Sequence, residues 1–329
     1  DDPTVGSSYA LDSLRAQFSY SEASDKILNA LTLIGCIVSI VALFFALAFF
    51  IFIKHSSLDT ERILIHRNLM GALLVAMVIF LVSTYLTNLK IPCQILAGLL
   101  HYLYLAVFCW MLVEGVHLYR LIVTVYGSER QMAKIYYAIG WGLPVLIVGI
   151  SAGIKWTDYG ILGKACWLNP ANGFIWAFVA PACAIMVVNF VVLGLVIKTT
   201  VLASKLCSPD TMMKVKAGLR SSLVLLPMLG ITWTTGLITH ISSVFTYIFV
   251  IMNSFQGLWL VIVCCLLNGE VRSAFQQAVK KKLGKFSGTV DVSTTGSGPA
   301  QLSSHTSRKP SKDPTKASKE RSTALTQVD

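Results

Sequence analysis

A run of twenty uncharged, mostly apolar residues constrains this chain more than any other feature. It covers residues 94–113 and directly follows Cys93. Twenty helical residues at about 1.5 Å each cross the roughly 30 Å hydrocarbon core of a bilayer. Glu114 comes next, so Cys93 and Glu114 are expected near opposite faces of a membrane. A carboxylate at that depth costs about 2–3 kcal/mol unless it is paired or hydrated, so Glu114 is either a functional residue or a paired structural one.

The rest of the chain is also apolar. Of its 329 residues, 55% are hydrophobic and 13% are charged, whereas soluble domains carry about 25% charged residues. This composition predicts an all-α membrane protein with a seven-transmembrane helix bundle. The expected spans are about 27–53, 64–89, 93–126, 133–154, 173–197, 217–240 and 244–267. The expected organisation is an extracellular segment 1–26, a membrane domain 27–268, an interfacial amphipathic helix 269–284 and a disordered cytosolic tail 285–329.

Basic residues predict which side of the membrane each end occupies. Sixteen Lys and Arg lie in the connections after the first, third and fifth spans and just after the seventh, five lie on the other side, and six more lie in the tail. Because Lys and Arg concentrate in cytoplasmic loops, the N-terminus is expected outside and the tail in the cytosol. This distribution explains the net charge of +11 without a nucleic-acid partner.

The segment after the last span carries signals for the inner membrane surface. Val271, Ala274, Phe275 and Val279 fall on one helical face, and the lysines of 280–285 lie where anionic lipid head groups are expected. Cys264 and Cys265 precede this helix, so they are either palmitoylation sites or buried packing residues. The Ser/Thr-rich tail beyond it offers hydroxyl groups for phosphorylation by kinases.

Two features predict how the bundle is pinned and where it bends. Cys93 opens the third span and Cys166 lies between the fourth and fifth, both on the predicted outer side, where a disulfide would hold the loop over the bundle. Pro227 removes a backbone donor inside the sixth span and Gly230 adds slack. Their bend is either the hinge of a conformational switch or a static kink.

Polar and aromatic residues mark two candidate sites. His66 enters the second span from the predicted cytosolic side and Glu114 leaves the third toward it, so each can satisfy the other as a polar lock; His117 follows one turn later. At the outer half, aromatic and amide side chains are candidates for an apolar ligand pocket with polar anchors. They are Tyr104, Phe108, Trp110, Trp167, Trp233, Asn253 and Gln256, with Phe108, Trp233 and Gln256 the strongest.

Enzyme chemistry is not indicated. The chain contains no GxSxG, HExxH or P-loop motif, and its six histidines lie on different segments without metal-ligand spacing. We therefore expect neither catalytic residues nor a metal or other cofactor.

Several motifs in chain order resemble secretin-like G-protein-coupled receptors, and within that group the adhesion branch, such as latrophilins. The motifs are IHRNL at 65–69, LVEGVHLY at 112–119, GWGLP at 140–144, CWL at 166–168, PMLGITW at 227–233, NSFQG at 253–257 and LNGEVR at 267–272. GITWTTGL and NGFIWAFVAPAC favour adhesion receptors over peptide-hormone receptors. The resemblance covers about 27–280 and implies the membrane-spanning part of such a receptor, without its large ectodomain and self-cleaving site.

The resemblance implies a role for each matching position. Cys93 and Cys166 would form the extracellular disulfide, and His66 and Glu114 the inactive-state lock. His117, Leu118 and Tyr119 would face a heterotrimeric G protein, while Pro227 and Gly230 would form the hinge. The agonist-sensing toggle and its surroundings would comprise Phe108, Met111, Trp167, Trp233, Asn253 and Gln256.

The agonist itself is expected to be a peptide, separate or tethered. SSYALDSL at 7–14 loosely matches the start of the family's tethered agonist through Ser7, Tyr9, Ala10 and Leu11, and is otherwise a linker. Two alternative functions stay open: a peptide-hormone receptor lacking its ectodomain, and a transporter or channel. The second is disfavoured by the few charged residues in the spans and by the absence of a half-to-half repeat.

Overall fold

The computed structural model describes most of the helical part of the chain. The described residues are 3–52, 60–123, 132–162, 165–170, 173–203, 230, 232–236, 238, 242–266, 271–272 and 276. Residues 1–281 form one structural unit. Residues 282–329, which include the expected cytosolic tail, lie outside the described residues, as does nearly all of the expected amphipathic helix 269–284.

Long apolar helices dominate the described residues. They are α1 (Pro3–Phe52), α2 (Thr60–Tyr85), α3 (Lys90–Val123), α5 (Leu143–Lys155) preceded by α4 (Ala133–Tyr137) and the π-helix η1 (Ala138–Gly142), α6 (Trp176–Ala203), and α8 (Ser243–Ser254) followed by α9 (Gln256–Val261) and the π-helix η3 (Ile262–Leu266). Five segments are long and apolar enough to cross a membrane, and the bent α8–α9 pair makes a sixth. These segments confirm a helical membrane protein. Most of the expected span 217–240 lies outside the described residues.

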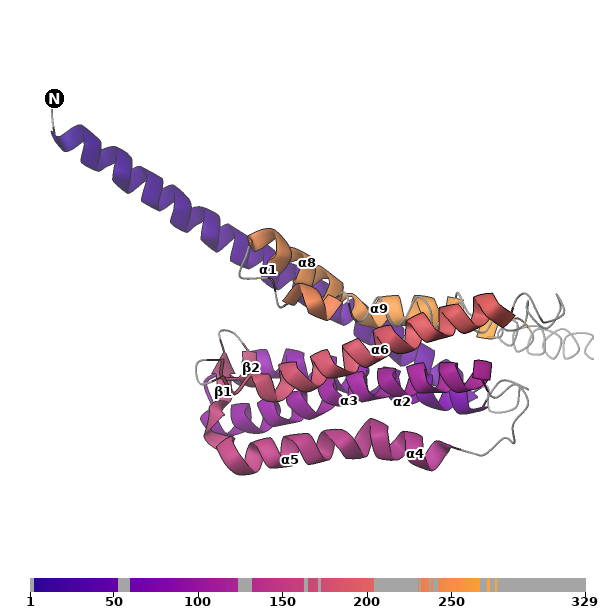
Figure 1. Cartoon of the computed structure of the whole chain (residues 1–329). Helices are drawn as coiled ribbons and strands as arrows, with labels where there is room; N and C mark the ends of the chain where they lie inside the picture. Colours follow the sequence, from indigo (N-terminus) through magenta and orange to yellow (C-terminus); the bar gives the residue numbers. More distant parts are fainter. Residues whose placement is uncertain are drawn as a thin grey trace, which may run out of the picture. The chain divides into compact units, whose positions relative to one another are not determined.

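Helix α3 lies at the centre of the bundle. It contacts α2, α5 and α6, and β1 (Tyr159–Leu162) and β2 (Ala165–Leu168) pack against its first turns (Figure 1). In the most apolar 18-residue segment of α3, 61% is buried. In the corresponding segment of the span formed by α4, η1 and α5, 11% is buried. The charge-free run of α3 therefore packs mainly against protein, and the α4–α5 span offers most of its surface to lipid.

Proline and glycine explain the break in the fourth span. Pro144 follows the π-helix η1 and has no N–H to donate to the carbonyl one turn earlier, so the helix widens there. Gly140 lies inside this turn against Trp110 of α3, and a Cβ at Gly140 would be 2.3 Å from Trp110 Cε2. The GWGLP motif thus lets α3 approach closely.

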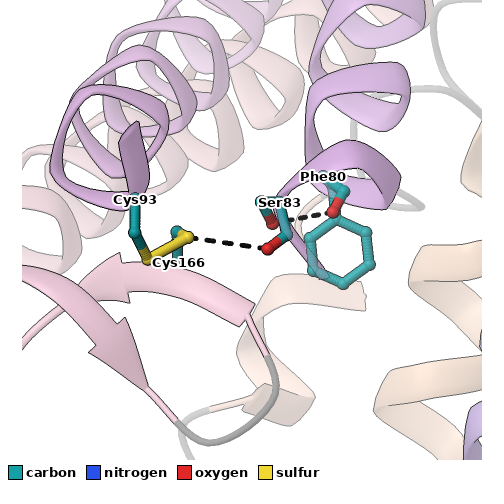
Figure 2. Close-up of a disulfide and its surroundings, with 4 residues drawn as sticks. All are labelled: Phe80, Ser83, Cys93 and Cys166. Atoms are coloured by element: carbon teal, nitrogen blue, oxygen red, sulfur yellow. Dashed lines mark hydrogen bonds between the residues drawn. A yellow bond between two sulfur atoms is a disulfide. The ribbon is translucent and has the colours of Figure 1, made fainter. Parts of the chain in front are cut away.

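Strands β1 and β2 pair antiparallel as a hairpin, and a disulfide joins this hairpin to α3, as expected. Cys93 and Cys166 are bonded with a Cα–Cα distance of 5.2 Å, and Figure 2 shows the bond running from the helix to the strand. Cys166 Sγ also lies 3.6 Å from the carbonyl oxygen of Ser83 in α2. Because a disulfide sulfur carries no hydrogen, this is a packing contact. The disulfide therefore holds the hairpin across the ends of α2 and α3.

The N-terminal segment has a helical backbone. Helix α1 begins at Pro3, so residues 7–14 continue the first span as one helix. The side chains of Ser7, Tyr9, Ala10 and Leu11 lie outside the described set, so the agonist and linker interpretations both stay predictions.

Candidate functional site

A cavity of about 380 Å³ lies at the disulfide end of the bundle. Its walls come from α1, α2, α3, β2, α6, residues 233–236 and the α8–α9 bend, and its lining is mostly apolar. Five of the six expected toggle residues line it, namely Phe108, Trp167, Trp233, Asn253 and Gln256. Segments distant in sequence thus converge on one chamber large enough for several side chains of a ligand.

Trp233 is the centre of the ring contacts around this cavity. Its ring centroid lies 5.2 Å from that of Tyr104, 5.4 Å from that of Phe108 and 5.4 Å from that of Phe178. Phe249 of α8 lies 6.2 Å away. These are the separations of tilted and edge-to-face aromatic pairs. Displacement of Trp233 would therefore change its packing against α3, α6 and α8 together.

Two expected residues lie away from the main cavity. Met111 lines a separate small cavity of about 10 Å³ with Met186, Asn189, Phe190 and Gly230. It is one turn along α3 from Phe108, on the side away from the disulfide. Trp110 is fully buried but packs against Gly140 and Tyr137 rather than the cavity. The pocket residues on α3 are thus Tyr104 and Phe108, which share a helix face.

Three buried polar atoms beside the main cavity have no hydrogen-bond partner among the described residues. They are the donors Trp233 Nε1 and Gln256 Nε2 and the acceptor Asn253 Oδ1. Buried polar groups are usually hydrogen-bonded, and leaving one unsatisfied costs about 1–3 kcal/mol. Water or a ligand with both acceptor and donor groups could satisfy them.

The bend between α8 and α9 presents Gln256 to this cavity. The two helices meet at 52°, and Ser39 of α1 fills the break. Its hydroxyl donates to the Ser254 carbonyl at 2.7 Å and accepts from the Leu258 N–H at 3.3 Å. Ser254 and Leu258 would bond to each other in an unbroken helix, so the hydroxyl is inserted into the helical ladder. Sequence reasoning missed Ser39, because a lone serine in an apolar span gives no signal.

The hairpin is tied to two helices near the cavity. Burial raises the pKa of Tyr159 to about 12, so its hydroxyl stays protonated. That hydroxyl lies 2.8 Å from His101 Nδ1, and His101 Nε2 lies 3.3 Å from the Ala177 carbonyl oxygen. The two bonds are satisfied when Tyr159 donates to Nδ1 and Nε2–H donates to Ala177. The hairpin, α3 and α6 are thereby linked, and sequence reasoning found neither residue.

At the opposite end of the bundle, the two residues expected to form a polar lock lie together, and their role as a lock stays a prediction. His66 Nε2 lies 3.4 Å from Glu114 Oε1, and both side chains are almost completely buried. Cys264 of η3 is also fully buried, while Cys265 is partly buried. Palmitoylation of these cysteines stays a prediction. The lock connects α2 to α3 in a region of the bundle that is closed to solvent.

A second polar cluster lies beside the lock, and we name it the loop clamp. It consists of Glu61, His117, Arg120 and Tyr136. The Tyr136 hydroxyl lies 3.2 Å from His117 Nδ1 and accepts from Arg120 Nη1 at 3.0 Å, while His117 Nδ1 lies 3.7 Å from Glu61 Oε2. Sequence reasoning singled out only His117 of these four.

The three residues expected to face a G protein are arranged differently from one another. His117 and Leu118 are buried, and Tyr119 is exposed. Of the two hinge residues, Pro227 lies outside the described set, and Gly230 packs against Phe190, whose Cζ would lie 3.2 Å from an added Cβ. On the described residues, His117 belongs to the loop clamp rather than to an open surface.

The chain matches the family model for seven-transmembrane receptors of the secretin family over residues 25–260. It is 41% identical over 261 residues to adhesion G-protein coupled receptor D1 of Bos taurus, covering 77% of this chain and 28% of the relative. It is 38% identical to adhesion G protein-coupled receptor L1 of Homo sapiens, covering 78% of this chain and 18% of the relative. The chain thus spans less than a third of the length of these relatives.

Proposed function

Because the chain belongs to the secretin family of seven-transmembrane receptors, and its relatives above are adhesion receptors, we propose that it is a G-protein-coupled receptor of the adhesion type. It lies in the plasma membrane with its N-terminus outside. A peptide agonist, separate or tethered, enters the main cavity. The signal passes to a heterotrimeric G protein through movement of the span at about 217–240.

The observation that carries this proposal is the position of Trp233 in the cavity wall. Rings from α3, α6 and α8 meet this one side chain. An agonist that displaces it changes the packing of three helices together with the span that holds Trp233 itself. A ligand shifts an equilibrium between two states only by its different affinities for them. The agonist must therefore bind more tightly to the state in which the span at about 217–240 is bent.

The chemistry of the cavity supports a peptide agonist with apolar side chains. An apolar lining favours aliphatic and aromatic groups. Trp233 Nε1 and Gln256 Nε2 would donate to carbonyl oxygens, and Asn253 Oδ1 would accept from an N–H. A peptide backbone carries both kinds of group. The segment 7–14, with Ser7, Tyr9, Ala10 and Leu11, is the candidate tethered agonist of this chain.

At the opposite end, the polar lock supports the same mechanism. His66 and Glu114 hold α2 against α3 in the resting receptor. Separation of this buried pair opens a cytosolic cavity in which Tyr119 and the loops contact the G protein. Arrestin and kinases act on the Ser/Thr-rich tail, and the lysines of 280–285 contact anionic lipids.

The first experiment tests receptor identity and self-activation together. Basal cAMP and calcium signalling are measured in cells that express the whole chain or a variant lacking residues 1–20, at matched surface level. We expect basal signalling from the chain, and its loss on truncation if residues 7–14 are the agonist. Signalling that survives truncation would show that these residues are a linker and would still support the receptor function.

The second experiment tests the toggle. Trp233→Ala should abolish the response to an agonist peptide while leaving surface expression intact. Trp259→Ala is the matched control, because Trp259 is 41% exposed on α9, away from the cavity lining. An unchanged response in Trp233→Ala, or an equal loss in both variants, would remove Trp233 from the mechanism.

A further inference from the structure

The loop clamp joins three helices without using either residue of the polar lock. Glu61 comes from the first turn of α2, His117 and Arg120 from α3, and Tyr136 from α4. Tyr136 is 1% exposed, so its hydroxyl is removed from bulk water, and it lies within hydrogen-bond distance of His117 and Arg120. A charge-assisted hydrogen bond to a buried hydroxyl is better ordered than an exposed ion pair.

The clamp also binds the backbone where α4 begins. The Met132 N–H donates to Glu61 Oε1 at 2.9 Å. Met132 is the residue before α4, and its own side chain makes no capping hydrogen bond. The first N–H groups of a helix need outside acceptors, and a carboxylate there also suits the helix dipole. Glu61 thus acts as a cap supplied from another helix, 71 residues away in sequence.

The two ties act on the same short segment from different sides. Glu61 holds the backbone at Met132, and the α3 residues hold the side chain of Tyr136, four residues further on. Met132 is also partly buried against the core. The entry into α4 therefore has a fixed position relative to the ends of α2 and α3.

We propose that the loop clamp positions the entry into α4, where the second cytosolic connection ends, for docking of the G protein. This inference rests on the proposed function. The four residues are positioning residues and need not touch the G protein. A docking segment whose end is already held in place loses less conformational entropy when the partner binds. Loss of the clamp should therefore weaken G-protein binding without changing the exchange step itself.

The test uses purified receptor in lipid nanodiscs and a panel of purified heterotrimeric G proteins. The rate of GDP–GTP exchange is measured against G-protein concentration for Tyr136→Phe, which removes only the hydroxyl. We expect the half-saturating concentration to rise about fivefold, as for one net hydrogen bond, and the maximal rate to stay unchanged. Tyr137→Phe is the matched control, because Tyr137 is exposed and its hydroxyl accepts a long hydrogen bond of 3.5 Å from Asn68 Nδ2. It should behave as the unmodified receptor.

A second pair of variants separates the backbone tie from the charge. Glu61→Ala removes the acceptor for the Met132 N–H, whereas Glu61→Gln keeps a side-chain oxygen there. Hydrogen–deuterium exchange at the Met132 amide should accelerate in Glu61→Ala and much less in Glu61→Gln. This readout does not depend on signalling.

The outcomes are distinct. Unchanged Met132 exchange in Glu61→Ala would show that Glu61 does not hold the backbone at Met132. Faster amide exchange with an unaltered half-saturating concentration, or a lower maximal rate alone, would overturn the docking role. If the unmodified receptor activates no G protein of the panel, the proposed function fails with the docking role, while Met132 exchange still decides whether Glu61 caps α4.

Discussion

The two ends of the bundle use the same helix in opposite ways. At the disulfide end, Tyr104 and Phe108 of α3 border a cavity of about 380 Å³ with unsatisfied polar atoms around it. At the other end, Glu114 and His117 of α3 lie in closely packed polar contacts with α2 and α4. Phe108 and Glu114 are six residues apart, roughly 9 Å along the helix axis.

This difference indicates that the two ends of the bundle have different roles. A hollow end is suited to receive a ligand, whereas an end filled by closely packed polar side chains is suited to hold one conformation. Added volume should therefore stabilise the first region and block its ligand, and removal of a polar partner should destabilise the second. The following substitutions test that contrast.

The largest effect is expected at the polar lock. His66→Ala leaves the buried Glu114 carboxylate without its imidazole neighbour, and loss of one partner of a buried pair is destabilising by about 3–5 kcal/mol. Thermal unfolding in detergent should shift to lower temperature, and basal signalling should rise. The double variant His66→Ala/Glu114→Ala should be more stable than His66→Ala alone. A double variant that is less stable would mean that the two residues act independently.

A smaller effect is expected from the disulfide. Joint replacement of Cys93 and Cys166 by Ala removes a cross-link between positions 73 residues apart. It should lower the free energy of unfolding by about 2–4 kcal/mol. The agonist response should fall because the hairpin, whose Trp167 lines the cavity, is no longer held in place. The basal output, which we propose the lock sets, should change little. Cys265→Ala at the other end is the control. Equal effects on basal output and agonist response would contradict a separation of the two ends.

Ser39→Ala tests the bend that holds Gln256. Loss of a hydroxyl that bridges Ser254 and Leu258 should lower stability by about 1–2 kcal/mol and reduce agonist potency. Ser151→Ala is the matched control, because the Ser151 hydroxyl bonds only to Ile147 of its own helix and should be near neutral. Equal stability of the two variants, measured by thermal unfolding, would mean that the bend persists without Ser39.

The sequence predicts the polar lock better than the cavity. A single acid after twenty uncharged residues is conspicuous, because burial of a charge demands a partner, and His66 is expected at a similar depth in the second span. The disulfide followed from the predicted sidedness of two cysteines. Both predictions depend on the scarcity of a residue type at a given membrane depth.

The residues that sequence reasoning missed are of common types. Phe178 and Phe249 cannot be told from other aromatic residues in apolar spans, and their contact with Trp233 depends on helix rotation. Tyr136 and Glu61 lie near helix ends, where polar residues are expected to be solvated. Helix–helix packing in lipid is set by side-chain shape more than by polarity, so the pattern of apolar residues does not identify the facing surfaces.

The smallest effect has the opposite sign and sharpens the comparison most. Ala182 of α6 is buried in the cavity wall, and Ala182→Leu adds apolar atoms to empty space, which should stabilise the receptor by about 1 kcal/mol. Under the proposed function the same atoms fill volume that the agonist needs, so the response should fall although the protein unfolds at a higher temperature. Ala180→Leu, two residues earlier on the exposed face of α6, is the control and should leave the response unchanged. A stabilised Ala182→Leu that still responds fully would mean that the agonist does not use this cavity.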